Sequence, residues 1–109
     1  MADHIDAITE ERGKRYGSPL DHFSCTGLMF GIWYKRYIKH NRPQQPVDPH
    51  AEAAFLHAVH MIFDKLARAA SDPLYRDNWD DIEGYVRCLK TFMPFPKQPS
   101  ALDLEGPPV

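Results

Sequence analysis

Apolar residues recur at helical spacing in one long segment of this chain. Five of them advance by four, three, four and three residues: Phe55, Val59, Ile62, Leu66 and Ala69. This spacing puts all five on one face of an α-helix. Asp48-Pro49 before the segment supplies a cap and a first-turn proline, and Ser71-Asp72-Pro73 after it ends the pattern. The spacing predicts a helix from residue 49 to about residue 70.

The N-terminal part of the chain predicts a short helix followed by a loop. Residues 3–12 suit a helix, because Ile5 and Ile8 share one face and acidic residues come early. Gly13 and Gly17 then flank a basic and aromatic stretch. Paired glycines favour a loop that brings its backbone close to another group.

Two more helices complete the domain. Ser18-Pro19 is a helix start, and the second helix is expected to run to about His40. Asp77 caps or enters a fourth helix. Its core face repeats at helical spacing: Trp79, Ile82, Val86, Leu89 and Met93.

The fold class is therefore predicted as all-α, a compact bundle of about four helices in residues 1–93. No strand-like alternation and no glycine-rich phosphate loop appears, so an α/β nucleotide fold has little support. Residues 94–109 hold half of the ten prolines: Pro94, Pro96, Pro99, Pro107 and Pro108. Few residues there can build a core, so we expect a flexible or extended tail.

Overall charge and cysteine usage exclude several classes of protein. A formal net charge of -2 gives no general attraction for nucleic acid or anionic lipid. Cys25 and Cys88 lie far apart without metal-type spacing, which indicates reduced thiols. No stretch approaches the length of a spanning helix and no secretory leader is evident. We expect a soluble protein of the cytoplasm.

The second helix, across residues 21–40, is apolar on two sides. Phe23, Phe30, Tyr34 and Tyr37 form one face, and a nearly opposite face holds Leu28, Met29 and Ile32. A helix that is apolar on both sides is usually buried on both sides. In so short a chain this indicates a homo-oligomer interface, with coverage of both faces by the other helices as the alternative.

The third helix carries a polar face that allows three interpretations. Its members are His57, His60, Asp64 and Arg68, with Lys65 at the flank. The simplest interpretation is a solvated surface. The two histidines with Asp64, and Asp81 from the next helix, are metal-ligand candidates by residue type. Lys65 and Arg68 are instead suited to a phosphate or carboxylate.

The fourth helix and the first loop add further candidates. Asp77 and Asp81 lie one turn apart, so they can bind Mg²⁺ or accept the hydroxyl and amino groups of a nucleoside. A helix cap and an ordinary surface acid are the alternative. Arg12, Lys14 and Arg15, with Tyr16, can grip phosphate and stack on a base, or can simply be solvated.

Three segments together resemble a known family. They are Arg15-Tyr16-Gly17 with Asp21-His22-Phe23, then MIFDKLAR from Met61 to Arg68, and DNWDDIEGY from Asp77 to Tyr85. The resemblance is to small phage and prophage proteins that look distantly similar to the all-α MazG-like NTP pyrophosphohydrolases. It implies a helical domain that handles nucleotides in the host cell cytoplasm.

The sequence departs from the metal-binding pattern of MazG-like enzymes. Those enzymes hold Mg²⁺ with an E-x-x-E pair and an E-x-x-D pair on neighbouring helices. Here the third helix offers Asp64, Lys65 and Arg68, and the fourth offers acids four residues apart. Lys65 and Arg68 can neutralise phosphate without a bridging metal. This favours capture of a nucleotide over its hydrolysis, with no cofactor required.

The expected ligand site therefore combines residues from three segments. Its members are Arg15, Tyr16, Lys65, Arg68, Asp77, Asp81 and Tyr85. Phosphates are expected on Lys65 and Arg68, and base or ribose near the acids and Tyr85. The first alternative is an Mg²⁺-dependent hydrolase with Asp64, Asp77 and Asp81 as metal ligands. The second is a protein-interaction module without a pocket.

Overall fold

The computed structural model describes residues 2–41 and 48–93, and within them it contains four α-helices and no strand. The helices are α1 (Ala2–Tyr16), α2 (Pro19–Asn41), α3 (Pro49–Ser71) and α4 (Arg76–Phe92). The predicted all-α class is confirmed. The expected flexible tail, residues 94–109, lies outside the described residues.

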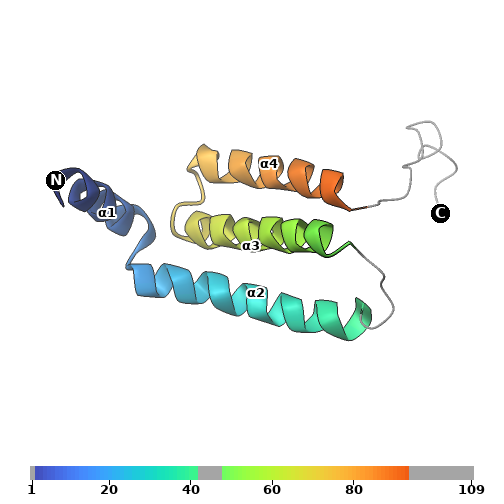
Figure 1. The fold of residues 1–109 in the computed structure, drawn as a ribbon. Coiled ribbons are helices and arrows are strands. Elements are labelled where there is room, and N and C mark those ends of the chain that lie inside the picture. Colours follow the sequence, from blue (N-terminus) through green and yellow to red (C-terminus); the bar gives the residue numbers. More distant parts are fainter. Residues whose placement is uncertain (1, 42–47, 94–109) are drawn as a thin grey trace, which may run out of the picture.

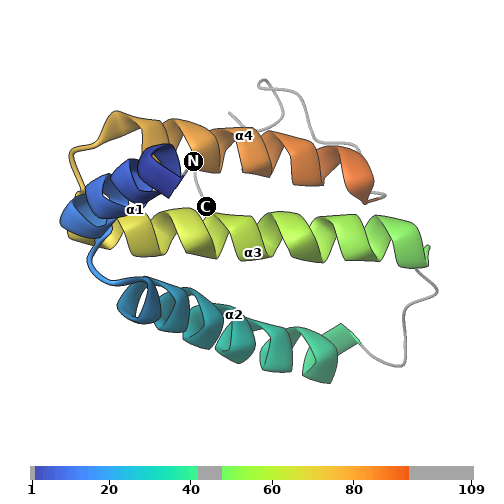
Figure 2. The ribbon, with the colours of Figure 1, turned by 60° about the vertical axis from the view of Figure 1, so that its left-hand side comes forward.

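Three of the helices lie side by side in one layer, with α3 in the middle (Figure 1). α3 contacts each of the other three helices. α1 packs against α2 and α3 at the end of the layer where α2 begins and α3 ends (Figures 1 and 2). The elements therefore converge at one corner, formed by α1 and by the adjoining ends of α2, α3 and α4.

The start of α3 follows the predicted cap. Asp48 Oδ1 accepts a hydrogen bond of 2.9 Å from the backbone N–H of His50, which satisfies one of the free donors of the first turn. Pro49 takes the first helical position. The helix ends at Ser71, one residue beyond the expected end.

The loop predicted for residues 13–17 is largely wrong. α1 continues through Gly13 to Tyr16, and only Gly17 leaves the helix, with a φ of 85°. A helical glycine costs only about 1 kcal/mol relative to alanine. Tyr16 is 7% exposed, and burying a large aromatic side chain at the corner outweighs that cost.

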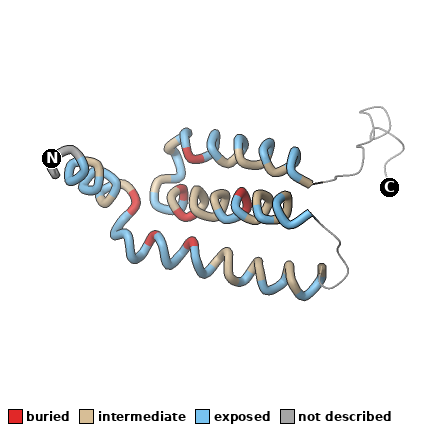
Figure 3. The backbone as a smooth tube through the Cα atoms, in the orientation of Figure 1, coloured by how far each residue is buried: buried red, intermediate tan, exposed pale blue. Residues whose placement is uncertain are grey.

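The core lies along α3 and at the corner, where Figure 3 places most of the buried residues. Val59 and Ala69 of the predicted α3 face are buried, and its other members are half-buried. On α4 the prediction fails at Trp79, which is 43% exposed, whereas Asn78 is 2% exposed. The Trp79 indole Nε1 donates to the Pro73 carbonyl at 2.8 Å, so this ring lies against the turn between α3 and α4.

The described helices cover only one face of α2. Its aromatic face is half-buried and stacked, through Phe30, Trp33, Tyr34 and Tyr37. Leu28 and Ile32 on the other face are 68% and 73% exposed. None of the four helices, over the residues described, has both the length and the apolarity that crossing a membrane requires.

Candidate functional site

Asp64 lies at the centre of a group of four side chains from α2 and α3, here called the Asp64 cluster: His22, Thr26, Asp64 and Arg68. His22 Nε2 lies 3.0 Å from Asp64 Oδ1, and Arg68 Nε lies 3.2 Å from Oδ2. Thr26 Oγ1 is 3.4 Å from Oδ1. The two nitrogen contacts are ion-pair distances without hydrogen-bond alignment. Buried His22 and Thr26 thus tie α2 to a carboxylate that faces the corner.

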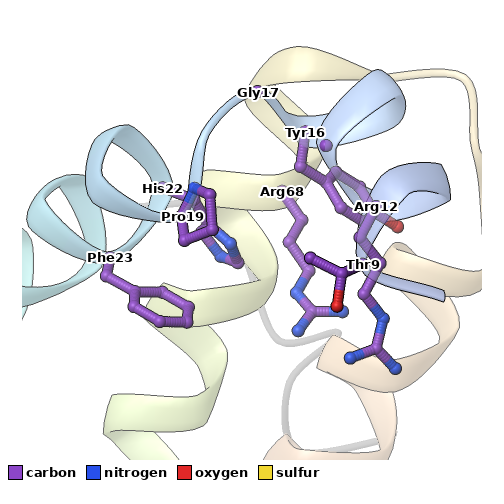
Figure 4. Close-up of a pocket in the computed structure, with 9 residues that line it drawn as sticks. Thr9, Arg12, Tyr16, Gly17, Pro19, His22, Phe23 and Arg68 are labelled. Atoms are coloured by element: carbon purple, nitrogen blue, oxygen red, sulfur yellow. The ribbon is translucent and has the colours of Figure 1, made fainter. Parts of the chain in front are cut away.

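Arg12 and Arg68 bring two guanidinium groups to this corner. Arg68 Cζ lies 5.2 Å from the centroid of the buried Tyr16 ring, and its Nε faces Asp64. In Figure 4 the guanidinium groups of Arg12 and Arg68 point in the same direction. Arg12 makes no ion pair within residues 5–41 and 48–93. Among the described residues only Arg68 of this pair has a carboxylate at ion-pair distance, so the two guanidinium groups can accept a further anionic partner.

The other predicted cations at the corner have acidic partners. Lys65 Nζ contacts Asp81 Oδ2 at 3.0 Å and joins α3 to α4. The Arg15 guanidinium lies 3.1 Å from an Asp72 carboxylate oxygen, and its Cζ is 3.9 Å from the centroid of the Tyr75 ring. The corner therefore carries mixed charge.

A cavity of about 380 Å³, here called the polar cavity, opens between α1, α3 and α4. Six of the seven predicted ligand residues line it: Arg15, Tyr16, Lys65, Arg68, Asp77 and Asp81. Tyr85, one turn beyond Asp81 on α4, does not. The volume lies within the usual range of small-molecule sites, about 300–1,000 Å³.

Asn78 is a lining residue that the sequence analysis missed. It lies on α4 and is buried, and within residues 5–41 and 48–93 its amide Nδ2 has no hydrogen-bond partner. A buried amide donor without a partner costs about 1–3 kcal/mol, so such donors are normally satisfied by a bound group or water. The helical spacing assigns Trp79 to the core and so does not predict that Asn78 is buried. The one sequence signal for Asn78 is its position in the DNW run.

A second, smaller cavity lies on the other side of Tyr16 and is here called the aromatic cavity. It has a volume of about 170 Å³. Figure 4 shows the side chains around it, which include Tyr16, Pro19, His22 and Phe23. Three residues line both cavities: Arg12, Tyr16 and Arg68. The two cavities therefore meet at the guanidinium pair.

The electrostatics of the polar cavity also act on Tyr75. The Asp77 carboxylate accepts a hydrogen bond from the phenol and repels its anionic form, which raises the pKa of Tyr75 above 10.0. Arg15 acts in the opposite direction and is the weaker influence. The raised pKa favours the neutral phenol, which acts as a hydrogen-bonding group.

The metal-ligand candidates do not converge. His57 and His60 are exposed on α3, and the His60 ring packs against Phe30 with centroids 4.7 Å apart. Asp64 and Asp81 are each held by a cation from α3. In the described part of the chain, no group of three or more His, Cys, Asp or Glu residues is placed to hold a metal ion.

Comparison with known proteins gives one match. The family model described as "Domain of unknown function (DUF6378)" matches residues 1–93, the part of the chain that contains all four helices. No curated protein and no solved structure matches the chain.

Proposed function

Since this chain belongs to the DUF6378 family, a domain of unknown function, we propose its role from the geometry of the corner. The protein captures a nucleotide or a nucleotide-derived signal in the polar cavity and does not hydrolyse it. The resemblance to small phage proteins supports placing this capture in the cytoplasm of a host cell. No cofactor is required for it.

The observation that carries the proposal is the lining of the polar cavity. Four cationic side chains line it, against three acidic ones: Arg12, Arg15, Lys65 and Arg68, and Glu11, Asp77 and Asp81. The unpartnered amide of Asn78 lines the same space. A guanidinium group can bind two phosphate oxygens at once, and an ammonium group binds phosphate as a point charge. A multiply charged phosphate group with hydrogen-bonding substituents suits this lining.

The ion pairs at the corner leave room for such a ligand. Asp81 is 49% exposed on its side chain, whereas Lys65 is 14% exposed. A phosphate that reaches Lys65 can replace Asp81 as the partner of this largely buried ammonium group, and the half-exposed Asp81 carboxylate then returns to solvent. Asp77, Asp81 and the Asn78 amide are then available for ribose hydroxyl or amino groups of the ligand.

The test is calorimetry with ATP, GTP and cyclic mononucleotides, each in Mg²⁺ and in EDTA, followed by chromatography of the recovered ligand. We expect one of these nucleotides to bind in EDTA and to return intact. Arg12→Ala and Arg68→Ala should each weaken its binding at least about tenfold, the loss of one charge-assisted contact.

Arg76→Ala is the matched control, because Arg76 is 88% exposed on its side chain and lies outside both cavities. Binding that requires Mg²⁺ and yields a cleaved nucleotide would replace capture with the hydrolase alternative. That alternative assigns the metal to Asp64, Asp77 and Asp81. Unchanged affinity in both arginine variants would remove the site.

A second candidate function rests on α2. Its uncovered side and the neighbouring Phe63 of α3 form an open groove of about 710 Å³, lined by Met29, Ile32, Trp33 and Phe63 and by three basic side chains. We propose that a second copy of the chain covers it. Leu28 and Ile32 flank the middle of α2, so antiparallel pairing brings these residues together and keeps the basic C-terminal halves apart.

A further inference from the structure

We propose that the aromatic cavity is the base-binding subsite of the same ligand site, and that it takes a planar heterocycle against Phe23. The inference rests on the proposed function, since it assigns the aromatic part of the nucleotide to a place beside the phosphate. Its chemistry differs from that of the phosphate site, because aromatic side chains supply stacking beside the shared guanidinium groups.

The size and lining of the aromatic cavity suit a ring. An engineered apolar cavity of about 150 Å³ binds benzene, and this one has about 170 Å³ with an open side. In Figure 4 the Phe23 ring lies on one side and Tyr16 and Arg68 lie on the other, with Pro19 and His22 between them in this view. A ring in this cavity lies among aromatic side chains and a guanidinium group, and both kinds of group stack on bases.

Phe23 has the exposure expected of a stacking platform. It is 64% exposed at the start of α2, and its ring is 5.3 Å from the His22 ring, centroid to centroid. The buried His22 is held in turn by Asp64. One side of the phenyl ring thus has a fixed support, while most of its surface remains available to a ligand.

The guanidinium pair connects this subsite to the phosphate. Arg12, Tyr16 and Arg68 line both cavities. A phosphate held by the two arginines therefore leaves the rest of the nucleotide within reach of either cavity. The polar cavity offers acids and an amide, which suit hydroxyl and amino groups. The aromatic cavity, with Tyr16, His22 and Phe23 in its lining, suits the base, in place of the expected position near Tyr85.

The experiment compares a nucleotide with its phosphate part alone. The affinities of ATP, GTP, CTP and inorganic tripolyphosphate are measured by calorimetry on the whole chain, for the wild type, Phe23→Ala and Leu20→Ala. Leu20 is 80% exposed on the same turn of α2 and lines neither cavity. Proton NMR of the nucleotide gives a second readout, because stacking on a phenyl ring shifts the base protons upfield.

We expect the wild type to bind at least one nucleotide more tightly than tripolyphosphate. Phe23→Ala should reduce that nucleotide's affinity by about 10- to 100-fold, the effect of one lost stacking partner. It should leave tripolyphosphate binding unchanged and abolish the upfield shift. Leu20→Ala should match the wild type.

Equal affinity of the nucleotide for the wild type and Phe23→Ala would overturn the subsite while leaving the phosphate site intact. Equal losses of nucleotide and tripolyphosphate binding would overturn it too, since Phe23 would then act on the whole corner. Failure of every nucleotide to bind the wild type would remove both the subsite and the proposed function.

Discussion

Asp64 balances the charge of the corner. Its carboxylate has a side chain only 15% exposed and contacts both the buried His22 and the half-buried Arg68. A charged group in such a place is stable only with partners, and the partners depend on it equally. The carboxylate therefore fixes Arg68 on one side while leaving the guanidinium group available to the cavities.

Asp64→Asn tests this dependence. The substitution keeps the volume and removes the charge, so Arg68 loses its carboxylate at a partly buried position. We expect the free energy of unfolding, measured by urea denaturation, to fall by about 3 kcal/mol. Asp80→Asn is the control, since Asp80 is 53% exposed and its contact with Arg76 is 3.5 Å long. Its loss should be below about 0.5 kcal/mol, and an equal loss in both variants would contradict the role of Asp64.

Tyr75 gives a prediction about pH. Its pKa is raised above 10.0 chiefly by Asp77, so the folded protein favours the neutral phenol. The stability that this contributes is present below pH 10.0 and is lost as the pH rises through the folded-state pKa. Asp77→Asn should lower the Tyr75 pKa, measured from the near-ultraviolet absorbance of phenolate. Tyr75→Phe removes the Tyr75 phenol and so shows which absorbance transition belongs to it. An unaltered Tyr75 pKa in Asp77→Asn would show that Asp77 is not the cause of the raised value.

At the level of the helices, the connection between α1 and α2 sets the direction in which Arg12, Arg15 and Tyr16 reach the corner. Gly17 makes this turn with a φ of 85°, the left-handed region that other residues seldom adopt. Its N–H still donates to the Gly13 carbonyl at 2.9 Å, as the last bond of the helix. One residue therefore both ends α1 and redirects the chain.

Alanine substitutions at Gly17 and Gly13 distinguish a glycine required for a positive φ from a glycine that only lowers helix propensity. Gly17→Ala should reduce the free energy of unfolding by about 1 kcal/mol, because alanine is strained at a positive φ. Steric conflict is not the cause, since a Cβ there would lie 3.6 Å from its nearest neighbour, an Asp21 oxygen. Gly13→Ala should instead add about 0.5–1 kcal/mol, since Gly13 is helical with open space around it. Opposite signs in thermal or urea unfolding support this account, and equal signs refute it.

For the whole molecule, the central position of α3 decides which surfaces remain uncovered. It contacts α1, α2 and α4, so the outer side of α2 has no described helix against it. Exposed Leu28 and Ile32 lie on that side. A single exposed apolar residue is ordinary, but a continuous apolar strip marks an interaction surface.

Self-association through α2 can be tested by sedimentation equilibrium. Ile32→Glu places a charge in the middle of the proposed interface and should shift the protein from dimer to monomer at micromolar concentration. Leu74→Glu is the control, because Leu74 is 94% exposed in the turn between α3 and α4. A wild type that stays monomeric, or a dimer unaffected by Ile32→Glu, would argue against this interface.

Local signals in the sequence were enough to predict the helices. Pro49 and its Asp48 cap, and the regular face from Phe55 to Ala69, depend only on near neighbours along the chain. Most of the charged residues that line the polar cavity were also predictable by type, because cations and acids on polar helix faces are visible without a fold. The loop predicted at Gly13 was wrong, because the burial of Tyr16 stabilises the helix through Gly13. Local helix propensity takes no account of such burial.

The sequence by itself determined the helical class, the helix starts and the chemistry available on each helix, because periodicity and capping act within a few residues. Only the tertiary structure decided that Arg12 and Arg68 line the same two cavities, that Asp64 is shared by His22 and Arg68, and that Asn78 is buried in place of Trp79. These arrangements join residues up to 56 positions apart, from Arg12 to Arg68. They depend on how α1, α2 and α4 pack around α3, a global packing property that no local pattern encodes.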